Sequence, residues 1–260
     1  MFLKARTSTF LRSCGRKSNH RMSDFGQFEI PGHLTVAEGN GGLCKLVVTT
    51  AVSTAEIYLH GAHVTDFRKN GEPPLLFMSA SSHFAPDKAI RGGVPIIFPW
   101  FGAREGHPSH GYARTVTWDL KETALLSDGS VRVRLSMPAA DFRDVEYIVT
   151  IGEALTMELV VGNSGPVDFS FESTLHTYLH IGSIDTASIA GLDGIEFFDK
   201  VRNTLAVEDG DGITIWEETD RVYFDTTAAV EIIDPTLGRT IRVEKSGSAS
   251  TVIWNPWISK

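Results

Sequence analysis

Cysteine is nearly absent from this sequence of 260 residues, which contains only Cys14 and Cys44, far apart in the chain. Two separated cysteines exclude a disulfide framework and a cysteine metal site, and they favour an intracellular setting. The sequence also has no apolar run long enough to span a bilayer. The first 21 residues lack the apolar stretch of a secretory signal. We therefore expect a cytoplasmic protein with no membrane partner.

Acidic residues are missing from residues 1–21, which hold six of the 24 basic residues and many serines and threonines. This segment fits either an organellar transit peptide or a leader before a true start at Met22, and both interpretations stay open. The rest of the chain carries 18 basic against 32 acidic residues. Because of this excess of acidic residues, we do not expect residues 22–260 to bind nucleic acid. A phosphorylated ligand would have to be held by arginines placed at its binding site.

Helical periodicity is also missing, because no stretch of ten or more residues shows it. Many short segments instead alternate apolar and polar residues and are separated by Gly, Asn and Asp turns, which is typical of a β-sandwich or barrel. We expect residues 22–260 to form one such all-β domain, with irregular residues 82–113 as a functional loop region. The predicted strands are 43–50, 55–60, 63–68, 114–120, 131–136, 144–151, 155–159, 168–181, 213–216, 221–224, 229–233, 239–244 and 251–254.

Two short stretches each place one arginine beside glycines. Residues 91–102 read RGGVPIIFPWFG and residues 109–114 read SHGYAR. A guanidinium presents a planar fork of donors that suits phosphate or carboxylate, and neighbouring glycines let a ligand approach the backbone. Arg91 and Arg114 are therefore candidate anion-binding residues. The competing interpretation is that each forms a structural salt bridge with one of the many acids.

Residues 175–181, LHTYLHI, predict a strand with His176, Tyr178 and His180 on one face and apolar residues on the other. A metal pair of His176 and His180 on a helix is the alternative. It is disfavoured because Thr177 stands where zinc proteases carry glutamate. Four strand residues also span roughly 13 Å, too far for one metal. Ordinary hydrogen-bonded histidines remain a further interpretation.

Five segments occur together in an order and spacing that match a known family: residues 91–102, 109–114, 173–181 (STLHTYLHI), 191–199 and 252–258 (VIWNPWI). The sequence resembles the glucose-6-phosphate 1-epimerases, or hexose-6-phosphate mutarotases, of the aldose-1-epimerase (galactose mutarotase-like) superfamily. The resemblance covers roughly residues 25–260. It implies a large antiparallel β-sandwich with a sugar in an open cleft, and an enzyme that interconverts the α and β anomers of hexose 6-phosphates.

The resemblance also implies residue roles. His176 would be the general acid, and Arg91 and Arg114 would hold the 6-phosphate. Asp199 would hydrogen-bond a sugar hydroxyl, and His110 and Ser109 would line the same cleft. Asp199 as a turn residue and His110 as a loop brace remain alternatives. We expect a monomer with a small-molecule substrate, no metal and no cofactor.

One part of the family pattern is not found. The family's general base is a glutamate after the WNPWI segment, in a Cys-Ile/Val-Glu-Pro-type motif, whereas this sequence reaches its last residue at Lys260. We expect the closing strand to be missing and a sheet edge to be left unpaired. An incomplete sequence and a natural short form both explain this.

Two competing functions therefore remain. An aldose 1-epimerase for free sugars would not need the two arginines. A catalytically silent module that binds sugar phosphates would not need the glutamate.

Overall fold

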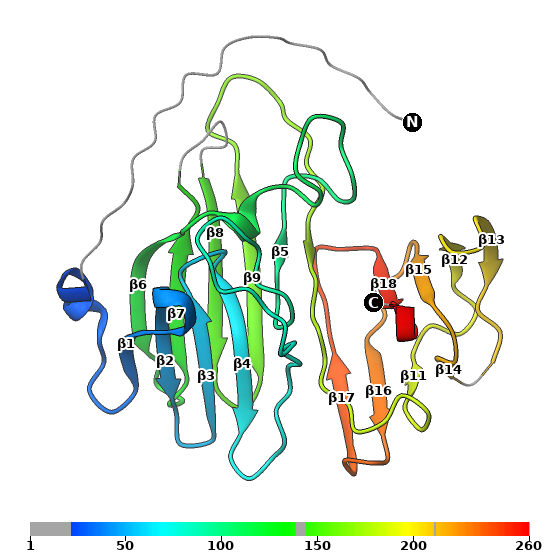
Figure 1. The fold of residues 1–260 in the computed structure, drawn as a ribbon, viewed down its shortest axis with the longest axis horizontal. Coiled ribbons are helices and arrows are strands. Elements are labelled where there is room, and N and C mark those ends of the chain that lie inside the picture. The colour runs from blue at the N-terminus through cyan, green and yellow to red at the C-terminus, as the bar shows by residue number, and fades with distance from the viewer. Residues whose placement is uncertain (1–21, 139–143, 211, 260) are drawn as a thin grey trace.

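The computed structural model describes residues 22–138, 144–210 and 212–259, so the basic leader and Cys14 lie outside the described residues. Strands form nearly all of the regular structure, and every paired strand in them runs antiparallel to its neighbours (Figure 1). The helical elements in the described ranges are four 3-10 turns. They are η1 (Met22–Phe28), η2 (Asn40–Gly42), η3 (Ala113–Thr115) and η4 (Trp257–Ser259). The fold is therefore all-β, as the sequence predicts.

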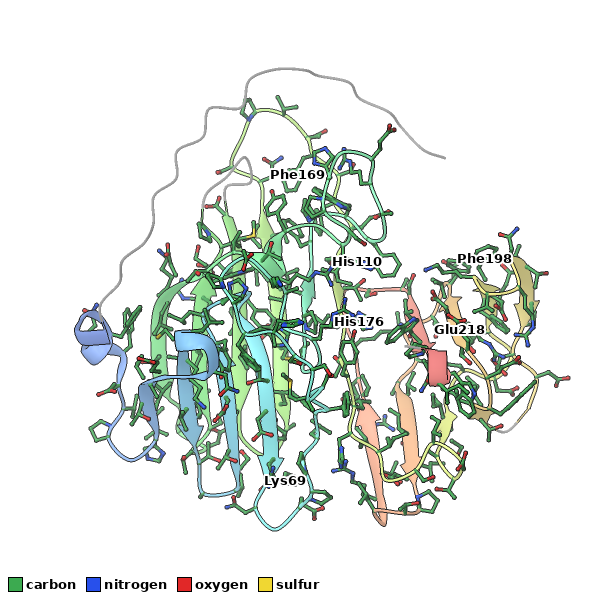
Figure 2. The ribbon with its side chains drawn as sticks, in the orientation of Figure 1. Lys69, His110, Phe169, His176, Phe198 and Glu218 are labelled. Carbon is green, nitrogen blue, oxygen red and sulfur yellow. The ribbon has the colours of Figure 1, made fainter. Side chains whose placement is uncertain are left out.

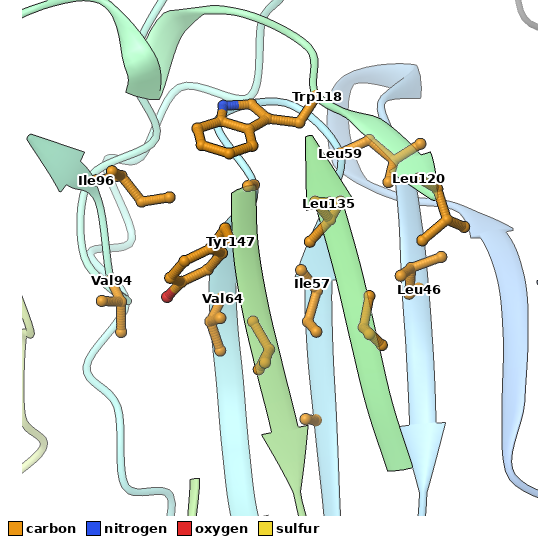
Figure 3. Close-up of a cluster of buried hydrophobic side chains, with 14 of the residues drawn as sticks. Leu46, Ile57, Leu59, Val64, Val94, Ile96, Trp118, Leu120, Leu135 and Tyr147 are labelled. Atoms are coloured by element: carbon orange, nitrogen blue, oxygen red, sulfur yellow. The ribbon is translucent and has the colours of Figure 1, made fainter. Parts of the chain in front are cut away.

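Two four-stranded sheets form the first lobe of the molecule (Figure 1). Their apolar faces form one core, in which Trp118, Tyr147 and Ile57 are almost completely buried (Figure 3). Ser53 also donates a hydrogen bond to the Gly152 carbonyl at 2.7 Å, which ties one sheet to the other. The first sheet contains β1 (Leu34–Glu38), β2 (Cys44–Thr49), β3 (Ser53–Tyr58) and β4 (His63–Lys69); the second contains β6 (Asp119–Leu125), β7 (Val131–Ser136), β8 (Asp144–Ile151) and β9 (Leu155–Gly162).

Strict alternation in the sequence explains the best-predicted strands. Apolar side chains of β8 point into the core at every second position, while the residues between them are more exposed. β7 shows the same pattern, because successive side chains of a strand point to opposite faces. The predicted strands 131–136 and 144–151 are confirmed residue for residue.

A second lobe contains two further four-stranded sheets and a smaller core (Figure 1). Leu75 and Leu179 pack against both cores and so join the lobes. One sheet has the order β14-β11-β16-β17, from Ile213–Thr214, Ser188–Ala190, Val230–Asp234 and Arg239–Val243; the other has β13-β12-β15-β18, from Thr204–Val207, Glu196–Asp199, Thr219–Tyr223 and Thr251–Asn255.

The segment between the lobes carries the two-stranded sheet of β5 (Ile96–Ile97) and β10 (Thr174–Leu175). Arg239 of β17 reaches this junction and donates hydrogen bonds to the carbonyls of Pro73, Pro74 and His180 at 3.0, 2.9 and 2.6 Å. Three carbonyls from two separate segments therefore share one guanidinium.

Two predicted strands are wrong in their extent. Residues 168–181 contain only β10 as a strand, because Thr177 donates to the Leu175 carbonyl in a tight turn. Residues 114–120 are mostly not a strand either, since η3 precedes β6 and Trp118 donates its indole N–H to the Ala113 carbonyl at 2.9 Å. Strands that no predicted range covers are β1, β5, β11, β12 and β13.

None of the helices in the described part of the chain is long and apolar enough to cross a membrane.

Candidate active site

His176 lies where the two lobes meet, directly after β10 (Figure 2). Its backbone N–H donates to the Pro95 carbonyl at 3.0 Å, and that of Tyr178 donates to the Gly93 carbonyl at 2.9 Å. These bonds fix the histidine segment alongside residues 93–97, just after Arg91. The RGG motif and the histidine motif are thus brought together although more than 80 residues separate them.

Three aromatic rings, from His176, Tyr178 and Trp254, lie in contact with one another. The rings of His176 and Tyr178 stack with centroids 4.7 Å apart, which confirms that the two side chains share a face. Trp254 of β18 meets both rings edge-on, with centroids 5.5 Å and 6.0 Å away. Burial among these rings is the main cause that lowers the pKa of His176 to about 4, and the electrostatic influence of His110 and Arg114 acts in the same direction. The opposing influence is Asp220, which raises it.

The two motif arginines lie close enough to act on each other and on Tyr178. Burial first, and then the charge of Arg91, lowers the pKa of Arg114. Both guanidinium charges lower the pKa of Tyr178, although burial raises it overall. Arg114 donates to the Ser109 carbonyl at 2.9 Å, and Arg91 is exposed. Among the described residues neither arginine has an acidic side chain within salt-bridge distance, so the salt-bridge interpretation gains no support.

His110 is held in the loop between the arginines by two contacts with Gly102. Its N–H donates to the Gly102 carbonyl at 2.8 Å, and its ring Nδ1 accepts from the Gly102 N–H at 3.1 Å. An accepting Nδ1 places the proton of the neutral ring on Nε2. Burial, Arg114 and Lys200 lower the pKa of His110, so the neutral form prevails at neutral pH. His110 is therefore a hydrogen-bond donor near His176, and Ser109 is exposed beside it.

Asp199, at the end of β12, has protein partners for both carboxylate oxygens. Oδ1 accepts from the backbone N–H groups of Val201 and Arg202 at 3.0 and 2.9 Å, and Oδ2 accepts from the Arg202 guanidinium at 2.9 Å. Burial raises the pKa of Asp199, but these hydrogen bonds outweigh it and lower the pKa overall. This geometry is that of a turn residue, and a contact with a sugar hydroxyl stays a prediction.

Sequence reasoning missed an ion pair at the edge of the site. Lys200 contacts the Asp220 carboxylate at 3.0 Å, and its ammonium lies 5.3 Å from the centre of the Phe101 ring, in the loop of the first lobe. Asp220 lies on β15 opposite Trp254 of β18. Only the register of these two strands brings Asp220 near His176, and no sequence motif signals that register.

A cavity of about 200 Å³ lies elsewhere, in the second lobe, lined by residues 189–193 and by Glu208, Gly210, Gly212 and Ile213. It contains none of the motif arginines or histidines, so it does not mark the site. The described residues contain no group of three or more His, Cys, Asp and Glu side chains arranged to hold a metal ion.

Comparison with known proteins agrees with the motifs. The sequence profile of the family described as "Aldose 1-epimerase" matches residues 45–260. A Salmonella typhimurium protein named "Putative glucose-6-phosphate 1-epimerase" is 34% identical over 220 residues, which cover 81% of this chain and 74% of that protein. A protein of the same name from Cenchrus ciliaris is 30% identical over 237 residues, covering 84% of this chain and 72% of the relative.

Solved structures share the fold. The crystal structure of a "putative mutarotase" from Salmonella typhimurium superposes with a TM-score of 0.80 at 30% identity, covering 91% of this chain and 83% of that one. A galactose mutarotase-like protein from Clostridium acetobutylicum has a TM-score of 0.64 at 12% identity, with 85% and 83% of the chains covered, and shows the fold alone. The architecture is the galactose mutarotase-like β-sandwich.

Proposed function

Because the chain belongs to the aldose 1-epimerase family, we propose that it interconverts the α and β anomers of hexose 6-phosphates, chiefly glucose 6-phosphate. The family membership and the names of the relatives support anomer interconversion. One observation carries the phosphate specificity: Arg91 and Arg114 flank the His176–Tyr178 pair, and neither has an acidic partner among the described residues. Two guanidinium groups without a carboxylate partner in this part of the chain suit a phosphate dianion.

His176 acts as the general acid in this proposal. The acid protonates the ring oxygen while a base removes the proton of the anomeric hydroxyl. The bond between the anomeric carbon and the ring oxygen breaks, and the anomeric C–O bond becomes a carbonyl. The open aldehyde rotates about its bond to the next carbon, and the ring oxygen then attacks the other carbonyl face while the protons return. The family resemblance assigns the base to a glutamate that follows residues 252–258.

Substrate binding favours the protonated form of His176, which a general acid requires. The imidazole of His176 is neutral near pH 7 in the free protein, because its pKa lies near 4. A phosphate dianion on Arg91 and Arg114 offsets the positive charge that contributes to this low value. An opposite charge nearby favours the imidazolium and raises its pKa. The phosphate therefore both anchors the sugar and makes His176 a more available acid.

The remaining partners follow from the same proposal. The substrate is a small molecule. It is bound by Arg91, Arg114, His110, Ser109 and Asp199. The protein is a cytoplasmic monomer without a nucleic-acid or membrane partner. The small number of cysteines and the acidic body support an intracellular setting and argue against nucleic acid.

Anomer exchange measured by NMR exchange spectroscopy tests the function. Glucose 6-phosphate and glucose are compared, using the 260-residue chain and a form extended through its reading frame. We expect the protein to accelerate anomer exchange of glucose 6-phosphate over the spontaneous rate and to have little effect on anomer exchange of glucose. Equal acceleration of both sugars would instead identify an epimerase for free sugars. Binding of the phosphate sugar without acceleration by either form would identify a silent binding module.

A further inference from the structure

Two buried histidines outside the proposed mechanism lie beneath the RGG motif. His60 lies in the turn between β3 and β4, and His63 is the first residue of β4; their exposed fractions are 2% and 0%. Histidine is seldom buried so completely unless its ring is hydrogen-bonded. Both rings have one such bond, and in both cases the partner belongs to residues 88–92, the segment that carries Arg91.

The hydrogen bonds show which ring nitrogen carries a proton in His60 and in His63. Nε2 of His60 is 2.7 Å from the Lys88 carbonyl, and Nε2 of His63 is 2.8 Å from the Gly92 carbonyl. A carbonyl only accepts, so each Nε2 carries a proton. Nδ1 of each ring is buried without a partner, which suits the unprotonated nitrogen of a neutral imidazole better than a second N–H. The two rings are therefore neutral donors that face the same segment from Lys88 to Gly92.

The backbone of Gly92 and Gly93, which follow Arg91, packs closely against the His63 ring. A Cβ atom at Gly93 would come within 2.3 Å of the Val64 carbonyl oxygen and 2.8 Å of Nε2 of His63. A Cβ atom at Gly92 would come within 2.6 Å of the Phe77 carbonyl oxygen. Both glycines have positive φ, 89° and 59°, which other residues rarely adopt. These contacts restrict the main chain after Arg91 to one conformation. The His63 ring is one of the groups against which it packs.

Further main-chain bonds connect this arrangement to the histidine motif. Gly93 donates to the Phe77 carbonyl at 2.8 Å, and Val94 donates to the Val64 carbonyl at 2.9 Å. The Gly93 carbonyl accepts from the Tyr178 N–H at 2.9 Å. A change in the position of Gly92 and Gly93 therefore shifts Arg91 relative to Tyr178 and His176.

We propose that His60 and His63 are positioning residues that fix the main chain of residues 88–93, and that through it they place the Arg91 guanidinium for the 6-phosphate of the substrate. They act on phosphate recognition and not on the chemical step, so they contribute to the preference for phosphorylated over free hexoses. This inference rests on the proposed function.

His63→Leu tests the proposal because leucine keeps an apolar side chain but cannot donate to the Gly92 carbonyl. His63→Gln is the rescue variant, since its amide N–H can reach the same carbonyl. We expect His63→Leu to raise the KM for glucose 6-phosphate by about tenfold or more, as expected when a buried hydrogen bond that positions a ligand contact is lost. We expect the kcat of His63→Leu to stay within about twofold of the wild-type value. His63→Gln should return the KM most of the way to the wild-type value.

Leu135→Ala serves as the stability control, because Leu135 is fully buried on β7, in the opposite sheet from His63, and its loss costs stability. All variants are assayed at a temperature where circular dichroism shows them folded. A wild-type KM in His63→Leu overturns the proposal, and so does an equal KM increase in Leu135→Ala.

Binding of inorganic phosphate, followed by ³¹P NMR, separates this inference from the proposed function. If the wild type does not accelerate anomer exchange, the function fails. The positioning role then still holds if His63→Leu weakens phosphate binding and His63→Gln restores it. Equal phosphate binding by wild type and His63→Leu, or no binding by either, overturns it.

Discussion

The indole of Trp254 meets the imidazole of His176 edge-on, with ring centroids 5.5 Å apart. Trp254 lies on β18 of the second lobe, whereas His176 follows β10 in the segment between the lobes. The edge of an indole ring solvates a charge less well than water does. This contact therefore favours the neutral imidazole over the imidazolium. The protonation state of the proposed acid thus depends on how the lobes pack.

The pKa of His176 should respond to phosphate. We expect a value near 4 in the free protein, well below the ordinary value near 6.5. Saturating glucose 6-phosphate or inorganic phosphate should raise it, because an anion near Arg114 stabilises the imidazolium. NMR titration of the histidine ring signals, assigned with His176→Asn, measures both values. An unchanged pKa in the presence of bound phosphate would contradict the proposed coupling.

Replacing the acid itself should separate binding from chemistry. His176→Asn keeps a polar side chain but cannot deliver a proton to the ring oxygen. We expect kcat to fall by about a hundredfold or more, the usual contribution of a general acid, with the KM for glucose 6-phosphate nearly unchanged. His180→Asn, on the same segment, is the matched control and should keep near wild-type kcat. Wild-type turnover in His176→Asn would remove His176 from the mechanism.

Both the fork of donors and the charge of Arg114 should contribute to phosphate binding. Arg114→Lys keeps a cation, whereas Arg114→Met removes it, and neither can form two parallel hydrogen bonds to phosphate. We expect the KM for glucose 6-phosphate to rise about tenfold in the first and about a hundredfold in the second, with little change for glucose. Arg132→Met is the control, because the pair that Arg132 forms with Glu122 is exposed. Equal KM changes for both sugars would argue against a phosphate contact.

The sequence predicts the first lobe much better than the second. β7 and β8 alternate apolar and polar residues without interruption, so their faces and bounds can be read directly. β11 and β12 are short and only partly buried, and β11 pairs with strands from residues 213–214 and 230–234. Short strands that are stabilised by distant partners leave little local pattern.

The same difference explains which parts of the candidate site could be predicted. Arg91, Arg114 and His176 stand in glycine- or histidine-rich motifs that are visible in one short stretch each. Asp220 and Trp254 become neighbours only through the pairing of β15 with β18. His63 looks like an ordinary strand residue until the structure shows Gly92 above it.

Arg239 should be important for the packing of the two lobes. Arg239→Met removes three hydrogen bonds to carbonyl oxygens at the junction and leaves those oxygens without this donor. We expect the free energy of unfolding to fall by about 2–4 kcal/mol, measured by urea denaturation. Arg242→Met on the same strand is the control, since its pairs with Glu231 and Glu244 are exposed and should contribute little to stability. Equal losses in both variants would contradict a special role for Arg239.

Acid should destabilise the protein partly through His63. Burial, the main cause, lowers the pKa of His63 in the folded protein to about 4, whereas an unfolded chain has the ordinary value near 6.5. Between these values the unfolded chain binds a proton that the folded protein excludes, so stability falls as the pH falls. The contribution of His63 is fully present above pH 6.5 and is lost by pH 4, a difference of about 3 kcal/mol.

Urea denaturation at pH 7 and pH 5 measures this contribution when wild type is compared with His63→Gln. Glutamine does not titrate, whereas the carboxylates and the other histidines are common to both proteins. The wild type should therefore lose more stability than His63→Gln over this interval, by about 2 kcal/mol. Equal losses would mean that His63 takes up a proton as readily in the folded protein as in the unfolded chain. Its ring could then not be the neutral donor that holds Gly92 beneath Arg91.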